Sequence, residues 1–289
     1  MEIITTPRDM QSRALTWRTE GRRIALLPTM GALHAGHVSL VEAAKHTAGF
    51  RPTHDKLIVS IFVNPLQFGP QDDLSRYPRP LAADIDTCVA AGVDCVFTPS
   101  PGDMYPTGFQ TEVSVKDVSQ GLCGASRPGH FTGVATVVLK LFMMTQPHLA
   151  CFGEKDFQQV AVIRQMVRDL NLPIDIVACP IRRDPDGLAL SSRNVYLSPD
   201  DRRQALALPQ ALAAAHAQVD AGETNAEYVT CTVRTHLVAQ PAITIDYIDI
   251  VDSQSLTSVS RIERGKTQLL AAIRVGHDPS TRLIDTIAL

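Results

Sequence analysis

Aromatic residues are scarce in this sequence: Phe, Trp and Tyr together make up only 5% of the 289 positions. Hydrophobic residues nevertheless reach 45%, so a core must be built mainly from Ala, Val, Leu and Ile. Aliphatic cores of this kind favour α/β layering, in which strands lie beneath Ala-rich helices. A chain of this length forms one large domain or two modest ones.

The sequence also lacks an excess of charge of either sign. The net charge is −3 with an isoelectric point near 6.3, and no long run of Lys and Arg occurs. The composition thus lacks the basic footprint of a nucleic-acid-binding protein, and we expect no nucleic-acid partner. An anionic ligand would require positive side chains that are gathered locally.

No C-x-x-C pair occurs among the six cysteines, so we expect buried free thiols in a reducing compartment. The first six residues lack the basic and apolar regions of a signal peptide. No apolar stretch approaches the length of a membrane span. These absences lead us to expect a cytoplasmic protein with no membrane partner.

Strand-like apolar runs alternate with helical runs through the first two-thirds of the sequence. Short strands that are apolar on both sides and separated by helices predict a parallel sheet with βαβ crossovers. We expect strands over residues 24–27, 57–63, 95–98, 149–152 and 174–180. We expect helices over residues 7–20, 36–45, 132–145 and 157–170. The helix over 132–145 is apolar nearly all round, which is typical of a helix buried in an interior or in a subunit interface.

The pattern changes in the last third of the sequence. Ser198 caps a long Ala-rich helix that reaches Gly222, with a bend expected at Pro209. Three strand-like runs follow, over residues 243–251, 269–275 and 282–288. The first of them alternates apolar and polar residues, which suits an antiparallel sheet with one face in water. We therefore predict a Rossmann-like domain over residues 1–181, with helices on both faces of its parallel sheet, and a smaller α+β domain over 182–289.

The most informative segment is PTMGALHAGH, residues 28–37, which follows an expected strand and opens an expected helix. Ligands bind at this end of the strands in an open α/β sheet. Gly31 and Gly36 permit a close approach of the backbone, and the helix N-terminus is expected to offer free N–H groups to phosphate. His34 and His37 are three apart, so both imidazoles project from one side of the first turn, suited to stabilising phosphate charge. Ordinary helix-end histidines, or half of a metal site, would show the same spacing.

Two further segments place polar side chains directly after expected strands. Gln67, in FVNPLQF, offers an amide donor and an acceptor that suit a small hydroxylated acid. Lys155, in GEKDFQQ, is a point charge at a helix start that suits a phosphate, and Gln159 lies one turn further on. Each of these residues is also common in polar loops and in capped helix starts.

The segment LSSRN, residues 190–194, lies near the start of the second predicted domain. Two hydroxyls beside a guanidinium are suited to clamping a triphosphate. A segment that closes over ATP would explain a position beyond the domain boundary. The same residues also fit an ordinary polar loop.

Together these segments resemble the pantothenate synthetase family in their order and separations, from Pro28 to about Pro199. The shared motifs are PTMGALHAGH, SIFVNPLQFGP, SRYPR, RPGHFTGV, GEKDFQQ and DGLALSSRN. The resemblance implies an AMP-forming ligase that condenses (R)-pantoate with β-alanine through a pantoyl adenylate, with release of pyrophosphate. It also implies ATP as co-substrate, Mg²⁺, a cytoplasmic homodimer and a place in the synthesis of a coenzyme A precursor.

The resemblance further implies roles for individual residues. His37 would be the proton donor, with His34, Lys155 and Arg193 as the other catalytic residues. The ATP-binding residues would be Met30, Gly31, Ala32, Leu33, His34, Ala35, Gly36, His37, Gly153, Glu154, Lys155, Asp156, Arg182, Leu190, Ser191, Ser192 and Arg193.

The substrate and metal positions follow from the same resemblance. Gln67 would contact both pantoate and β-alanine, and Gln159 would contact pantoate. Asp84 matches a position linked to Mg²⁺, although Ala83 stands where the family sometimes has a second acid. Two further residues match positions near the phosphates or a neighbouring loop, namely Tyr77 and Arg127.

Three other interpretations remain open from the sequence. A different adenylyltransferase of the same fold would act on another small acid or on a phosphorylated acceptor. A catalytically silent nucleotide-binding protein would keep the phosphate contacts without turnover. A structural zinc site from His34 and His37 would need a third and a fourth ligand, and none occurs at a suitable spacing.

Overall fold

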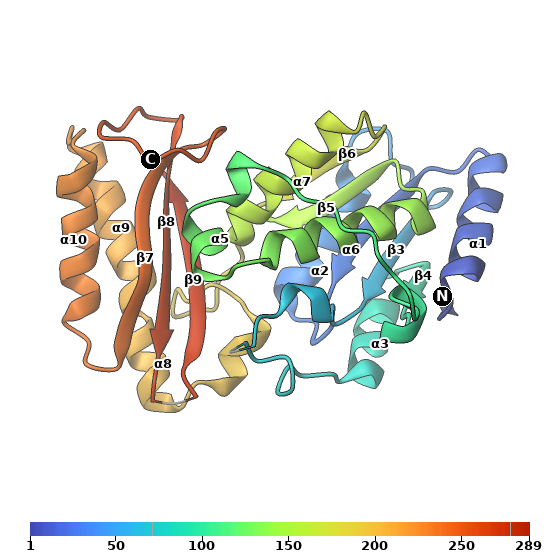
Figure 1. Ribbon diagram of the computed structural model, residues 1–289, viewed down its shortest axis with the longest axis horizontal. Coiled ribbons are helices and arrows are strands. Elements are labelled where there is room, and N and C mark those ends of the chain that lie inside the picture. Colours follow the sequence, from blue (N-terminus) through green and yellow to red (C-terminus); the bar gives the residue numbers. More distant parts are fainter. Residues whose placement is uncertain (71, 278) are drawn as a thin grey trace. The chain divides into compact units, whose positions relative to one another are not determined.

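The computed structural model describes residues 1–70, 72–277 and 279–289 (Figure 1). These residues form two compact units, and each unit is described by itself. Unit 1 comprises Met1–Val115, Pro128–Gly153 and Val162–Pro180, and unit 2 comprises Lys116–Arg127, Glu154–Ala161 and Ile181–Leu289. From Ile181 to the last residue the chain belongs to unit 2 alone. Two short segments that were predicted in the first domain, 116–127 and 154–161, belong to unit 2.

Unit 1 contains a parallel sheet of six strands in the order β1-β4-β3-β2-β5-β6 within the described part of the chain. Its strands are β1 (Glu2–Ile4), β2 (Ile24–Thr29), β3 (Lys56–Ile61), β4 (Cys95–Phe97), β5 (Leu149–Gly153) and β6 (Asp175–Cys179). Every neighbouring pair is parallel. The predicted strands are confirmed to within one or two residues at most ends, whereas the short edge strand β1 was not predicted. The direction of the chain around the sheet reverses between β2 and β5, which is where ligands bind in such sheets.

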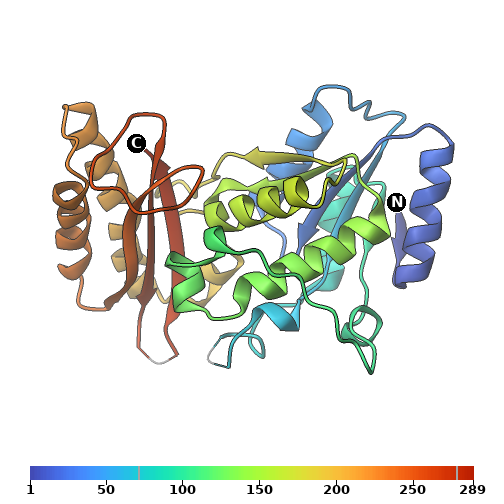
Figure 2. The same cartoon turned by 45° about the horizontal axis from the view of Figure 1, so that its top comes forward.

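Helices cover both faces of this sheet. The helices of unit 1 are α1 (Pro7–Thr19), α2 (Ala35–His46), η1 (Pro65–Gln67), α3 (Leu81–Ala90), α4 (Pro101–Met104) and α6 (His130–Thr145), and α7 (Phe157–Asp169) begins in unit 2 and continues in unit 1. On one face α6 packs against α1 and β2 (Figures 1 and 2). On the other face, residues of α2 and α3 share an apolar cluster with β2, β3 and β5.

The apolar helix α6 was predicted to lie in an interior or in a subunit interface. Twelve of its 16 residues are buried, including Val134, Val138 and Leu141. Because this burial arises within the single chain, α6 is an interior helix. Its composition therefore gives no support for a subunit interface.

Unit 2 contains an antiparallel sheet of three strands with helices packed on it. Its elements are η2 (Asp117–Ser119), α5 (Leu122–Ser126), η3 (Glu154–Asp156), η4 (Ser192–Tyr196), α8 (Pro199–Ala205), α9 (Ala207–Asp220), α10 (Ala226–Val238), β7 (Ile243–Asp252), β8 (Thr267–Val275) and β9 (Thr281–Ala288). The strand order is β7-β8-β9, with antiparallel pairing. Aliphatic residues of α9, α10 and β8 form its core. The two sheets together confirm the predicted fold class.

In unit 2 one predicted helix needs correction, and one observed helix was not predicted. The long helix from Ser198 to Gly222 is two helices that meet at Leu206, three residues before Pro209. Proline has no N–H to donate to the carbonyl four residues earlier, that of Ala205, and its ring crowds that carbonyl, so the helix breaks there. Helix α10 was not predicted, because its Thr and Val residues are typical of strands.

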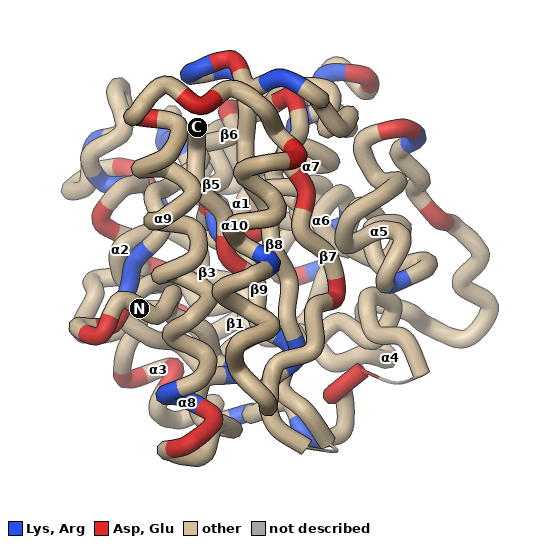
Figure 3. The backbone as a smooth tube through the Cα atoms, turned by 90° about the vertical axis from the view of Figure 1, so that its left-hand side faces the viewer, with Lys and Arg blue, Asp and Glu red and all other residues tan. Residues whose placement is uncertain are grey.

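The sequence also led to predictions about the distribution of charge, the cysteines and membrane spans. Lys and Arg are interspersed with Asp and Glu along the backbone in the view of Figure 3. All six cysteines are free thiols; five are buried, and Cys231 on α10 is exposed. Among the described residues, no helix is long and apolar enough to cross a bilayer.

Candidate active site

A tight turn joins β2 to α2 and carries the two predicted histidines; residues 30–37 are called the histidine turn below. Gly31 and Ala32 have left-handed backbone conformations, with φ angles of 81° and 50°. The N–H group of Gly31 donates to Thr29 Oγ1 at 3.2 Å. The Thr29 hydroxyl in turn donates to the carbonyl of Ser60 on β3 at 2.7 Å, so the turn is tied to the neighbouring strand.

Asp84 of α3 holds the next two amides of this turn. The N–H group of Ala32 donates to Asp84 Oδ2 at 2.9 Å, and that of Leu33 donates to Oδ1 at 2.7 Å. The Asp84 residue is 2% exposed. A buried carboxylate is costly unless it is hydrogen-bonded, and here each of its oxygens accepts a backbone N–H.

His34 and His37 cap the N-terminus of α2 for each other. The N–H group of His34 donates to His37 Nδ1 at 3.2 Å, and the N–H group of Gly36 donates to His34 Nδ1 at 3.1 Å. The two ring centroids lie 4.1 Å apart. Since each Nδ1 accepts a hydrogen bond, each neutral ring carries its proton on Nε2. The arrangement therefore places two neighbouring imidazoles with the proton of each on Nε2.

The expectation of free N–H groups at this helix start is wrong for two of the amides. The N–H of Gly36 is taken by His34 Nδ1, and the N–H of His37 donates to the carbonyl of His34 at 2.8 Å. The capping box thus satisfies donors that the sequence appeared to leave for phosphate. Contact of the two imidazoles with phosphate stays a prediction.

Asp84 does not fit the Mg²⁺ role that the family resemblance implies. Its oxygens are engaged by the turn, and it is almost fully buried, whereas protein-bound Mg²⁺ usually keeps several water molecules. Among the residues that the structure describes, no three His, Cys, Asp or Glu side chains gather to hold a metal ion. The same finding gives no support to a zinc site built from His34 and His37.

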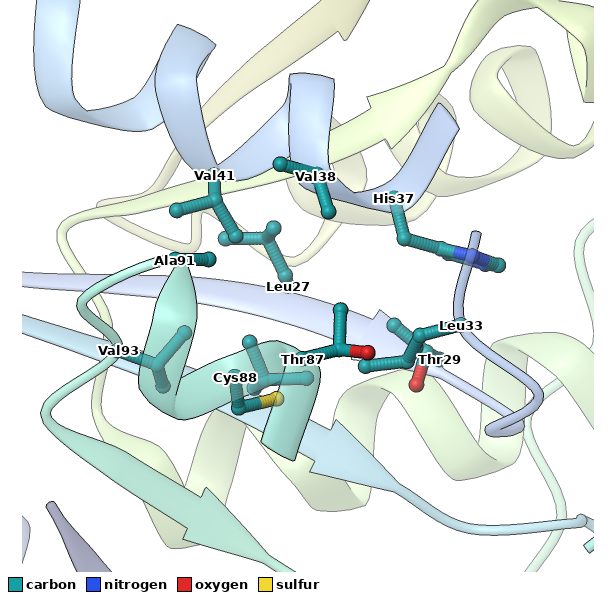
Figure 4. A pocket seen from close by; sticks show the side chains of 11 residues that line it. Leu27, Thr29, Leu33, His37, Val38, Val41, Thr87, Cys88, Ala91 and Val93 are labelled. Atoms are coloured by element: carbon teal, nitrogen blue, oxygen red, sulfur yellow. The ribbon is translucent and has the colours of Figure 1, made fainter. Parts of the chain in front are cut away.

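Two pockets adjoin the histidine turn within unit 1. The smaller one lies between α2, α3 and β2, and Figure 4 shows His37 at its edge with Thr29 and Leu33 nearby. Its volume of about 10 Å³ is no more than one water molecule needs, so it is not a substrate site. The larger pocket, about 280 Å³, lies where β2, β3 and β4 end, and its lining residues include Met30, Phe62, Arg79 and Asp84.

Gln67 ends the short helix η1, which follows β3. Its Nε2 donates to Met30 Sδ at 3.2 Å, and its Oε1 accepts from Asn64 Nδ2 at 3.0 Å. The structure thus brings Gln67 next to a residue of the histidine turn. The Gln67 amide is half-buried at the carboxyl ends of neighbouring strands, where both its donor and its acceptor group suit a small acid.

Residues of the RPGHFTGV motif and Tyr105 hold the loop that carries Gln67. His130 Nδ1 donates to the Gln67 carbonyl at 2.8 Å, and Asn64 Nδ2 donates to the Gly133 carbonyl at 3.1 Å. The Tyr105 hydroxyl donates to Asn64 Oδ1 at 2.7 Å, and burial raises the Tyr105 pKa, so the hydroxyl keeps its proton. The motif was recognised in the sequence, but no role for these residues was predicted.

Gly133 shows why the contact between α6 and this loop is so close. A Cβ atom at position 133 would lie 2.2 Å from the Leu66 carbonyl oxygen and 2.7 Å from the Gln67 nitrogen. No larger residue fits without a backbone shift. Glycine at this position therefore sets the distance between α6 and the loop.

In unit 2, Lys155 lies in η3 and donates to the carbonyl of Leu190 at 3.4 Å. Two of the predicted ATP-binding segments are therefore brought together within this unit. Gln158, the neighbour of the predicted substrate residue Gln159, is buried and holds the segment before α5. Its Nε2 donates to the carbonyls of Val118 and Gln120, at 3.1 and 3.0 Å, and Gln159 itself is half-buried.

Residues 182–196, called the serine segment below, fold into a loop and the short helix η4. The N–H of Leu190 donates to the carbonyl of Arg182 at 2.9 Å, and Ser191 Oγ accepts from the N–H of Arg193 at 3.2 Å. The Arg182 side chain is exposed, and Ser191, Ser192 and Arg193 are half-buried.

Ion pairs hold the first part of the serine segment. Arg183 donates two hydrogen bonds to Asp285 of β9, at 2.6 and 3.0 Å, and this carboxylate is almost fully buried. Arg202 of α8 pairs with Asp184 at 2.7 Å and with Asp186 at 2.8 Å. The sequence did not point to these ion pairs.

Tyr77 and Arg127, the two further residues that match family positions, lie in different units. Tyr77, in unit 1, is buried edge-on against Phe68, with ring centroids 5.9 Å apart. Arg127 ends α5 in unit 2 and is half-buried. The Phe68 contact makes Tyr77 a support of the loop that follows Gln67. Its predicted place near the phosphates stays a prediction.

Comparison with known proteins shows the family of this chain. Residues 2–288 match the family described as pantoate-beta-alanine ligase. The chain is 48% identical to the pantothenate synthetase of Oleidesulfovibrio alaskensis, with 100% of both chains covered. It is 52% identical to that of Anaeromyxobacter dehalogenans, with 98% of this chain and 97% of the relative covered.

Solved structures give the same result. The pantothenate synthetase of Thermus thermophilus superposes with a TM-score of 0.90 at 41% identity, covering 100% of this chain and 99% of the other. The pantoate-beta-alanine ligase of Francisella tularensis, complexed with beta-gamma ATP and beta-alanine, gives 0.78 at 34% identity, covering 100% and 97%. Fold, site motifs and whole-length similarity agree, and the chain belongs to the pantoate–β-alanine ligase family.

Proposed function

We propose that this chain condenses (R)-pantoate with β-alanine in an ATP-dependent reaction that forms pantothenate, AMP and pyrophosphate. Family membership supports the reaction class. The observation that carries the proposal is the histidine turn, in which each of two imidazoles after β2 accepts a backbone N–H at Nδ1 and so carries its proton on Nε2. Neutral donors of this kind suit an oxyanion whose charge grows during the reaction.

The first step of the proposed mechanism is adenylation. A carboxylate oxygen of pantoate attacks the α-phosphorus of ATP in line, the bond to the bridging oxygen breaks, and pyrophosphate leaves. Negative charge grows on the phosphate oxygens. We propose that His34 and His37 stabilise this charge by hydrogen bonds, and that Lys155 and Arg193 stabilise it by positive charge.

The second step is acyl transfer. The neutral amine of β-alanine attacks the carbonyl carbon of pantoyl adenylate, the carbon–oxygen bond to AMP breaks, and the amine loses a proton. Gln67 and Gln159 would hold the acids in position by their amide groups. Since no side chain forms a covalent bond to substrate, catalysis in this proposal is positioning and charge stabilisation.

Three further parts of the proposal rest on the family resemblance. They are MgATP as the nucleotide substrate, a homodimeric assembly and a cytoplasmic location. The residues that were predicted to bind ATP in the histidine turn, in 153–156 and in the serine segment are proposed as its contacts. The other adenylyltransferases of the same fold are not favoured by the relatives found.

The test is a product analysis with and without β-alanine. Purified protein is incubated with MgATP and pantoate, β-alanine is added to half the samples, and pyrophosphate, AMP and pantothenate are measured together. Pyrophosphate formed with pantoate alone, followed by AMP and pantothenate after β-alanine is added, is the expected result. Pyrophosphate release that ignores pantoate would contradict the proposal and favour another acceptor.

Two lysine variants provide the matched control. Lys155→Ala removes a proposed phosphate contact and is expected to lower kcat/KM for ATP about 1,000-fold. Lys266→Ala removes an exposed ion pair with Glu263 and is expected to leave the rate unchanged. Equal rates for the two variants would contradict the role of Lys155.

A further inference from the structure

We propose that Asp84 is a positioning residue that orients the two imidazoles by holding the histidine turn, and that it is not a ligand of Mg²⁺. The inference deepens the proposed function and rests on it only for its kinetic measurement. The structural measurement described below is independent of any catalytic activity.

The hydrogen bonds of Asp84 match the requirements of this turn. Ala32 has a φ of 50°, a conformation that is unfavourable for residues with a side chain and that persists only where the surroundings hold it. The Asp84 carboxylate accepts the N–H of Ala32 and the N–H of the next residue, Leu33, one on each oxygen. Two charge-assisted bonds thus fix the strained part of the turn.

A series of bonds connects this anchor to the rings. The N–H of Leu33 is held by Asp84, and the next N–H along the chain, that of His34, donates to His37 Nδ1. The His34 ring is fixed in the same way by the N–H of Gly36. The direction of each Nε2–H therefore depends on the position of the turn, and the position of the turn depends on Asp84.

The surroundings of Asp84 are poor for a cation. The pocket of about 280 Å³ that it lines includes one other charged residue, the cationic Arg79, and apolar residues such as Met30 and Phe62. Gly31 is so close that a Cβ atom there would lie 2.8 Å from Asp84 Oδ2. The carboxylate therefore packs directly on the turn whose amides it accepts, and its charged neighbour in the pocket is a cation.

The first measurement is hydrogen–deuterium exchange of the protein in EDTA, without nucleotide. In Asp84→Ala the peptide that covers residues 29–37 is expected to exchange faster, because the amides of Ala32 and Leu33 lose their acceptor. A residue that only binds Mg²⁺ would leave this exchange unchanged in EDTA. Unchanged exchange in a folded variant would overturn the proposal.

The second measurement is the rate of pyrophosphate release with ATP and pantoate. Asp84→Ala is expected to lower kcat/KM for ATP about 100-fold, the effect of losing hydrogen bonds to a charged group. The Mg²⁺ concentration that gives half the maximal rate is expected to stay the same, and excess Mg²⁺ is expected not to restore the rate. A raised Mg²⁺ requirement, or rescue by excess Mg²⁺, would overturn the proposal in favour of a metal ligand.

Two further variants separate the turn from the carboxylate. Gly31→Ala keeps Asp84 but forces the turn away from it, and it is expected to reproduce the faster exchange, the slower rate and the unchanged Mg²⁺ requirement. It also serves as the test if Asp84→Ala does not fold. Asp86→Asn removes an exposed carboxylate of the same helix and is expected to match the parent protein in all three measurements. A parent protein without ATP-dependent activity would refute the proposed function, whereas the exchange data would still decide the role of Asp84.

Discussion

The histidine turn of unit 1 and the serine segment of unit 2 are held in place by different forces. The turn is fixed by hydrogen bonds from its own amides to a buried carboxylate, to a hydroxyl and to imidazole nitrogens. The first part of the serine segment is fixed mainly by guanidinium–carboxylate pairs, and those of Arg202 are about one-third exposed. The Asp84 carboxylate that holds the turn is almost fully buried and thus shielded from dissolved ions, whereas the partly exposed pairs of Arg202 are screened by them.

This difference indicates different demands on the two segments. A group that stabilises charge in a transition state must be aimed in advance, which amides held by a buried carboxylate achieve. A segment held by partly exposed ion pairs depends on ionic strength and can rearrange at small cost. The geometry of the histidine turn is thus expected to be insensitive to salt, unlike that of the serine segment.

The largest effect is expected from separating the two functions of His37. His37→Asn keeps an acceptor near the position of Nδ1 but removes the Nε2 donor, so we expect kcat to fall about 1,000-fold with no change in Tm. His37→Gln keeps an amide donor near Nε2 but loses the cap. It should retain more activity and lose about 1 kcal/mol of stability. Steady-state kinetics and thermal unfolding measure the two effects. The same loss of activity and stability in both variants would contradict the division of roles.

Asp55 sharpens the comparison, because this one carboxylate both accepts backbone N–H groups and pairs with a guanidinium. It is buried, accepts the N–H groups of Arg23 and Arg51, and pairs with the Arg51 guanidinium. Burial acts to raise its pKa, but the hydrogen bonds from Arg51, from His54 and from the two amides outweigh burial and hold the pKa well below its usual range.

Because the folded-state pKa of Asp55 is lowered, its contribution to stability is present above the unfolded-state pKa, near 4, and is lost as the pH falls below it. Asp55→Asn is expected to reduce the free energy of unfolding by about 3 kcal/mol at neutral pH. The difference from the parent protein should shrink below about pH 4. Urea unfolding at several pH values measures this difference in the free energy of unfolding, with Asp86→Asn as the control. A difference that does not change with pH would contradict this account.

The smallest effect is expected at the ion pairs of the serine segment. Arg202→Ala should reduce the free energy of unfolding by about 1 kcal/mol at low salt and by less at high salt. Arg203→Ala removes a pair with Asp200 that is mostly exposed and should have no effect at either salt concentration. Denaturant unfolding at two ionic strengths provides the test. A loss for Arg202→Ala that is equal at both would remove the distinction between the two segments.

The sequence predicted most of the fold, because its signals are local. Short apolar runs marked the strands, and Thr6 before Pro7 marked the start of α1, where its side chain accepts the N–H of Asp9. The break at Leu206 was missed because Pro209 acts on a carbonyl four residues earlier. Helix α10 was missed because its Thr and Val residues are typical of strands, although Asn225 caps it.

The candidate site was predictable in part for the same reason. His34, His37, Gln67 and Lys155 lie in short motifs after strands, so their local position made them candidates, and the family resemblance supplied their expected roles. The role of Asp84 depends on contact with a turn about fifty residues earlier in the chain, which no local pattern contains. His130 and Gly133 likewise act on a loop more than sixty residues away.

The contact of Gly133 with the loop after β3 has a consequence for redesign of the substrate range. The path of this loop is set by Gly133, by the bond from Asn64 to the Gly133 carbonyl and by the bond from His130 to a main-chain carbonyl. The side chain at position 67 adds one bond to this scaffold, from Asn64 Nδ2 to its Oε1. The path of the loop and the amide that we propose to contact the acids are therefore determined largely by different residues. Libraries that vary position 67 while keeping 64, 130 and 133 constant would explore other acids without dismantling the scaffold that presents them.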